Sequence, residues 1–201
     1  MTRTRPPTGA IETAEPFGRR IYREAWDRGW DRAKTKVVLG DGALWIWNTA
    51  DEHFPGAIQI VDLYHARQHL WELAAKVYPA DEKQRKTWAS RLEKKLDAGK
   101  VETVVKDLRA VSTPSVALAE LVENEAAFFE RNAELMRYAH FRAQKLFVGS
   151  GVIEAGCKTV IGRRLKMSGM FWTLGGANSI IALRCNRISG KFTDYWESRV
   201  A

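Results

Sequence analysis

Two short apolar runs limit how this chain can fold. KVVLG (residues 36–40) and AIQIV (57–61) are rich in β-branched side chains, and each predicts a buried strand. Residues 43–53 lie between them and predict a short helix, which a Phe-Pro-Gly sequence ends. A helix that joins two strands implies a parallel pair. Ligands of such α/β units bind beyond the carboxyl ends of the strands, so that edge is where a functional site is expected.

The rest of the chain predicts helices. Residues 13–30 carry apolar side chains at helical spacing, and four helices are expected between His65 and Met136. The expected fold class is α/β, mostly helical, with a tail at 1–12, a partial core at 13–62, an all-helical insertion at 63–140, and the rest of the core with basic helices at 141–201. In the helix at 43–53 we expect four side chains to pack inward: Leu44, Trp45, Ile46 and Trp47. Two strands alone do not form a stable sheet, so either further strands are hidden elsewhere in the sequence or the chain lacks part of its sheet, and we take this as a first indication of truncation.

Positive charge is concentrated near the end of the sequence. The chain has a formal net charge of +8, and no acidic residue occurs from Gly156 to Phe192. Seven cations lie in that segment: Lys158, Arg163, Arg164, Lys166, Arg184, Arg187 and Lys191. Such a one-signed field attracts polyanions, although a solvated helix face is the simpler interpretation. The aromatic residues Phe171 and Trp172 within the segment favour nucleic acid as the partner.

Three acidic residues are candidates for a metal site. Asp41 and Asp62 each follow a predicted strand, and Glu154 lies at the start of a predicted helix in otherwise basic surroundings. Carboxylates are suitable Mg²⁺ ligands. Each residue also has a structural interpretation: Asp41 in an Asp-Gly turn, Asp62 as the cap of the next helix, and Glu154 as a complement to a helix amino terminus.

No feature of the sequence indicates a membrane or an export route. No apolar run approaches the ~18 residues that a transmembrane helix needs, and the basic start lacks the apolar stretch of a secretory signal. Cys157 and Cys185 are far apart in sequence and are expected to be reduced thiols.

Three longer segments resemble a known family. GDGALWIWN (40–48), HFPGAIQIVDLYHARQHL (53–70) and GSGVIEAGCKTVIGRRLKMSGMFWT (149–173) are similar to the Kra-type bacterial insertion-sequence transposases, which are distant relatives of the Mutator-like transposases. The resemblance implies a ribonuclease H-like core with an all-helical insertion and a DDE triad of carboxylates. It also implies Mg-dependent DNA strand cleavage and strand transfer at element ends, by a cytoplasmic, nucleoid-associated protein that forms at least a dimer on DNA.

The resemblance assigns roles to individual residues. Asp41 and Glu154 match the second and third members of the triad, which holds two Mg²⁺ ions, and His65 beside Asp62 matches a supporting histidine. His65 is equally compatible with an ordinary position at the start of a helix, and His53, His69 and His140 are interpreted as structural. Four cations are expected to contact phosphates next to the cut: Lys158, Arg163, Arg164 and Lys166. Trp172 is expected to stack on an unpaired base.

The chain departs from the family pattern before Asp41. Residues there predict a helix and no strand, so the first aspartate of the triad has no counterpart. We therefore expect an amino-terminally truncated transposase, inactive as it stands. The alternative is a non-catalytic DNA-binding remnant, or a competitor of the full-length transposase.

Overall fold

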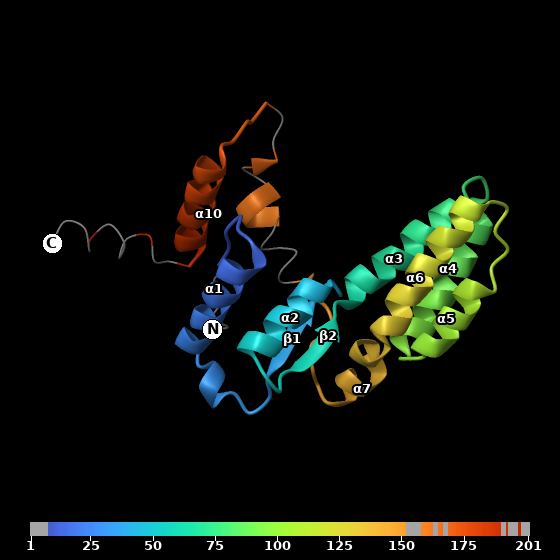
Figure 1. Ribbon diagram of the computed structural model, residues 1–201, viewed down its shortest axis with the longest axis horizontal. Coiled ribbons are helices and arrows are strands. Elements are labelled where there is room, and N and C mark those ends of the chain that lie inside the picture. The colour runs from blue at the N-terminus through green and yellow to red at the C-terminus, as the bar shows by residue number, and fades with distance from the viewer. Residues whose placement is uncertain are drawn as a thin grey trace. The chain divides into compact units, whose positions relative to one another are not determined.

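The computed structural model describes residues 8–151, 158–162, 165–166, 169–189, 192 and 197 (Figure 1). It is mostly helical with two parallel strands, which confirms the expected α/β, mostly helical class. The chain divides into two compact units. One is Thr35–Ser150, and the other combines Met1–Lys34 with Gly151–Ala201.

The unit Thr35–Ser150 begins with the predicted strand–helix–strand element. β1 (Val37–Gly40) and β2 (Ile58–Val61) are parallel, with Val37 opposite Ile58 and Gly40 opposite Val61. The connecting helix is α2 (Leu44–His53). Gly40 lets α2 approach the strand, because a Cβ at this position would lie 2.7 Å from Cγ2 of Ile46.

The packing of α2 differs from the prediction at its first turn. Trp47 and Ala50 are 7% and 1% exposed and form the buried side, whereas Leu44 and Trp45 are 68% and 45% exposed. A helix turns once in about 3.6 residues, so four consecutive side chains point in all directions and cannot all face the strands.

The remainder of this unit is helical, as predicted, with an additional short helix at its end. The elements are α3 (Leu63–Val77), α4 (Glu82–Asp97), α5 (Val101–Arg109), α6 (Val116–Arg131), the 3-10 helix η2 (Ala133–Met136) and α7 (Tyr138–Ala143). α3 packs against α4 and α5 against α6 (Figure 1). The long helix expected up to Met136 ends at Arg131 instead. Asn132 ends it, since its side chain donates to Phe128 O and accepts from Trp47 Nε1.

One hydrophobic core joins the strands to the helices. Ile60 and Val61 of β2 belong to the same cluster as Leu70, Leu108 and Phe129 of the helices, and all five are fully buried. The continuity of this core holds the carboxyl end of β2 rigidly against the start of α3.

The second unit joins the two ends of the sequence. It contains α1 (Ala14–Asp27), the 3-10 helix η1 (Trp30–Arg32), the π-helical segment η3 (Lys158–Gly162) and α10 (Leu174–Ile188). The backbone of Ile11 exchanges two hydrogen bonds with the Asn178 side chain, at 2.7 and 3.1 Å. The apolar spacing in residues 13–30 does not form a deeply buried face, since Gly18 is the buried residue of α1. Within the described part of the chain, no helix is both long and apolar enough to cross a membrane.

Candidate functional site

Asp41 is held in the turn that follows β1. Its Oδ1 accepts a hydrogen bond from the Ala43 N–H at 2.9 Å, while Oδ2 accepts none from the residues that the structure describes. The next residue, Gly42, has a φ of 96° and lies against Phe128, whose ring would be 2.7 Å from a Cβ at that position. Only glycine fits both conditions. The turn therefore presents an exposed carboxylate at the carboxyl end of the strand.

Asp62 follows β2 but is used internally. Its side chain is buried, and Oδ1 accepts hydrogen bonds from the N–H groups of Tyr64 and His65 at 2.8 and 3.1 Å. Oδ2 accepts a third from Ser150 N–H at 2.6 Å. Both oxygens are thus engaged, one in capping α3 and the other in fixing the segment that ends this unit. Of the two interpretations given for Asp62, metal ligand and helix cap, this geometry supports the helix cap.

The same segment explains Gly149. The Leu63 N–H donates to Val148 O at 2.8 Å, which places the following glycine directly on the Tyr64 ring. A Cβ at Gly149 would lie 2.6 Å from Cε2 of Tyr64. Within this chain, Gly149 therefore has a packing role beside the start of α3.

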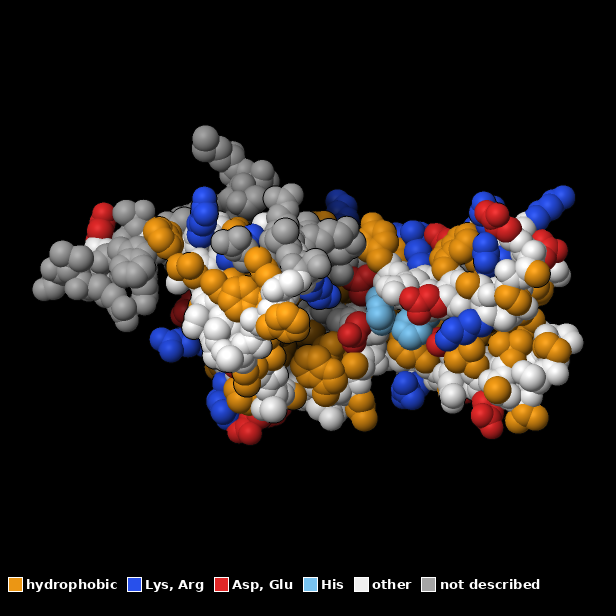
Figure 2. All heavy atoms as spheres, turned by 90° about the horizontal axis from the view of Figure 1, so that it is seen from above, with side chains coloured by type: hydrophobic (Ala, Val, Ile, Leu, Met, Phe, Trp, Pro, Cys, Tyr) orange, Lys and Arg blue, Asp and Glu red, His pale blue; other side chains and the backbone are white. Residues whose placement is uncertain are grey.

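His65 belongs to a chain of polar contacts that the sequence did not predict. Nε2 of His65 lies 3.2 Å from Nε2 of His69, one turn further along α3, and Nδ1 of His69 donates to Oε2 of Glu125 on α6 at 2.8 Å. The His69 ring also stacks on Phe128, with centroids 4.4 Å apart and planes at 11°. Figure 2 shows histidine side chains beside acidic ones on the surface. Histidine at positions i and i+4 of one helix is the sequence signal for this contact, whereas nothing local points to Glu125.

The surrounding charges favour the protonated form of His69. The hydrogen bond to Glu125 raises the pKa of His69, burial opposes that increase, and the negative charges of Glu125, Glu72 and Asp41 add to it. Asp41, at the carboxyl end of β1, makes the smallest of these contributions.

These residues only partly fit the expected Mg²⁺ site. Asp41 is an exposed carboxylate with an available oxygen, which suits a hard cation. Asp62 offers no free oxygen, and Glu154 lies outside the described residues. No three His, Cys, Asp or Glu side chains of the described part are placed to hold one metal ion.

The expected DNA-contacting residues are described in part. Arg163 and Arg164 lie outside the described residues, and Lys158 begins η3. Lys166 is exposed, and Trp172 is 39% exposed just before α10. Arg184, another cation of the basic segment, donates to Thr159 O at 3.2 Å through Nε, so it links α10 to η3.

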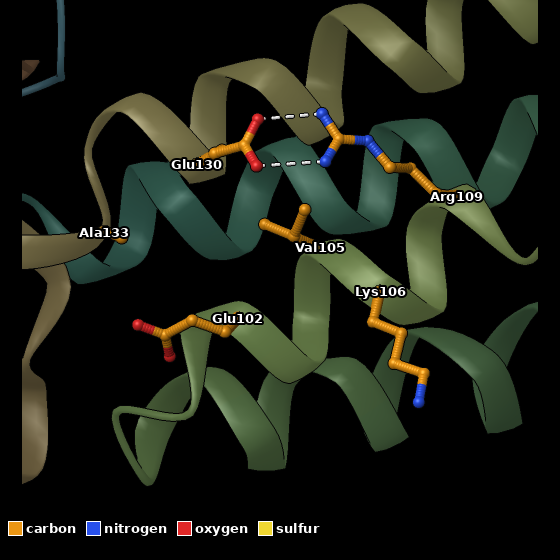
Figure 3. A pocket seen from close by; sticks show the side chains of 6 residues that line it. All are labelled: Glu102, Val105, Lys106, Arg109, Glu130 and Ala133. Carbon is orange, nitrogen blue, oxygen red and sulfur yellow. Dashed lines mark hydrogen bonds and ion pairs between the residues drawn. The ribbon is translucent and has the colours of Figure 1, made fainter.

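A separate pocket of about 420 Å³ lies in the helical part (Figure 3). It is lined by Glu102, Val105, Lys106, Arg109, Glu130 and Ala133. Arg109 forms a two-pronged ion pair with Glu130 in this view and also pairs with Glu123, and these contacts raise its pKa. The charges of Arg109, Glu130 and Glu102 are therefore matched within the protein.

Comparison of the chain with models of protein families, with curated proteins and with solved structures finds no match.

Proposed function

We propose that this chain is part of a DDE-type DNA transposase with a ribonuclease H-like core, related to the Kra-type insertion-sequence family. The observation that carries the proposal is the placement of Asp41. It is an exposed carboxylate in a GDGA turn at the carboxyl end of a strand, in a parallel strand–helix–strand unit followed by a long helical segment. The carboxyl ends of parallel strands are where α/β folds bind their ligands.

In this proposal Asp41 and Glu154 are Mg²⁺ ligands, and bound Mg²⁺ supplies charge stabilisation at the reacting phosphate. Lys166 and the other cations of the basic segment bind the DNA backbone, and Trp172 stacks on a base. Asp62 acts indirectly, because its three backbone hydrogen bonds fix the start of α3. That start carries His65 at the same edge as Asp41.

A non-catalytic DNA-binding protein is the second candidate. Residues 8–36 form α1 and η1 and contain no strand, so this described stretch supplies no counterpart of the first family aspartate. Two carboxylates without the third repel each other and bind metal more weakly. Such a chain would keep DNA binding without cleavage and would act as a remnant or a competitor.

DNA binding is the test common to both candidates. We expect a fluorescent 30-bp duplex (roughly three helical turns) to bind with an affinity that falls steeply as salt rises. Lys166→Ala should reduce the slope of log K against log salt by about 0.9, as expected for one lost phosphate contact. Lys83→Ala, at an exposed lysine of α4, is the matched control. An affinity that does not depend on salt would overturn both candidates.

A DNA cleavage assay distinguishes the transposase from the non-catalytic DNA-binding protein. Supercoiled plasmid is incubated with the chain and Mg²⁺ or Mn²⁺, and nicked product is measured. Nicking that is lost in both Asp41→Asn and Glu154→Gln supports the transposase. Salt-dependent DNA binding without nicking supports the non-catalytic candidate, which we expect for the chain by itself.

A further inference from the structure

The histidine pair on α3 has the geometry of two ligands of one metal ion. The Nε2 atoms of His65 and His69 are 3.2 Å apart, and the ring centroids are separated by 4.8 Å with planes at 83°. Two imidazole nitrogens that bind one zinc-class ion at roughly 2.0–2.1 Å with a tetrahedral angle lie about 3.3–3.4 Å apart. The 3.2 Å separation is thus close to the one that a shared metal ion requires, and the two nitrogens share a hydrogen bond when no metal is bound.

Glu125 completes the arrangement from a different helix. Its Oε2 accepts from Nδ1 of His69 at 2.8 Å, so in the neutral ring Nδ1 carries the proton and Nε2 carries the lone pair that a metal ion needs. Metal-binding histidines typically have a carboxylate in this second position, which fixes the tautomer and the ring orientation. Phe128 stacks on a face of the His69 imidazole and so holds the plane of that ring.

We propose that His65 and His69 form an open site for a zinc-class divalent ion, oriented by Glu125. Imidazole nitrogen suits Zn²⁺, Co²⁺, Ni²⁺ and Cu²⁺, whereas Mg²⁺ requires oxygen ligands, so this ion differs from the one expected at Asp41. No third metal-binding side chain of the described residues joins the pair, and water or an anion fills the remaining positions. Open positions are typical of sites that polarise a ligand. The proposal does not rest on the transposase assignment.

The test is metal uptake by the full chain after treatment with a chelator. Co²⁺ is titrated while the visible absorption of the bound ion is recorded, and Zn²⁺ binding is measured by calorimetry with excess Mg²⁺ present. We expect one ion per chain, with uptake lost in His65→Gln and in His69→Gln. Glu125→Gln should weaken binding by about 10- to 100-fold, as expected for loss of an orienting carboxylate.

His140→Gln is the matched control. His140 is an exposed histidine of α7 whose Nε2 contacts the Gln144 side chain at position i+4, so it has the same spacing without a second imidazole. This variant should bind like the wild type. Circular dichroism establishes that each variant is folded; if His69→Gln unfolds, His65→Gln decides the result. Absence of uptake at millimolar Co²⁺, or uptake unchanged in His65→Gln, overturns the proposal.

Discussion

Replacing Asp62 distinguishes a structural carboxylate from a catalytic one. In Asp62→Asn the amide oxygen can still accept from the Tyr64 and His65 N–H groups, but the NH₂ group then faces the Ser150 N–H, which is also a donor. The lost hydrogen bond to a charged group costs about 1.5–3 kcal/mol, and the lost negative charge at the start of α3 adds about 0.3–1 kcal/mol. We expect the free energy of unfolding to fall by about 2–4 kcal/mol.

Asp81 provides the matched control. It caps α4 with one hydrogen bond, from the Gln84 N–H at 2.8 Å, and is exposed. Because asparagine caps a helix about as well as aspartate, Asp81→Asn should change the free energy of unfolding by less than about 0.5 kcal/mol.

Urea denaturation followed by tryptophan fluorescence measures both variants, and the slope with urea should stay unchanged. Equal stability of Asp62→Asn and the wild type would refute the argument. It would show that the carboxylate is not needed for stability, and the result would then favour a role for Asp62 as a metal ligand.

Three further predictions concern the helical part. Tyr138→Phe should leave the free energy of unfolding unchanged or raise it by up to about 1–2 kcal/mol, because the buried Tyr138 hydroxyl has no hydrogen-bond partner among the described residues; a loss of stability in urea would contradict this. Leu108→Ala should cost about 2–5 kcal/mol in the same assay, since Leu108 is fully buried between α5 and α6, and a cost well below that range would show that the core collapses around it. Arg137 lowers the pKa of Glu102 from 4.5 to about 2, so its contribution to stability is present above pH 4.5 and is lost as the pH falls toward 2. The stability difference between the wild type and Glu102→Gln should therefore vanish over that interval, and a difference that persists below pH 2 would refute the ion-pair explanation.

Local patterns predicted the elements of the fold well. The two β-branched runs became the parallel strands, and the helices expected between His65 and Met136 are present as α3 to α6. Local patterns did not predict where α6 ends, because that region makes tertiary contacts. The Asn132 side chain, just past the end of α6, accepts a hydrogen bond from Trp47, and this contact between residues far apart in sequence is not visible in any local pattern.

For the candidate site, the sequence predicted the positions of the carboxylates but not their roles. A strand followed by Asp-Gly is enough to place Asp41 at the carboxyl edge, because the position depends only on the strand and the turn. Asp62 stands in the equivalent place after β2, yet its role differs, since Ser150 reaches it from a distant part of the chain.

The histidine pair also combines a local sequence pattern with contacts from a distant helix. The spacing of His65 and His69 gives their proximity, but the orientation of His69 depends on Glu125 and Phe128, which α6 supplies from more than fifty residues away. The helical segment between these residues therefore does more than extend the fold, because it determines which nitrogen of His69 carries the proton. A substitution on α6 that removes this carboxylate, such as Glu125→Gln, should therefore disturb the pair even though it leaves α3 intact.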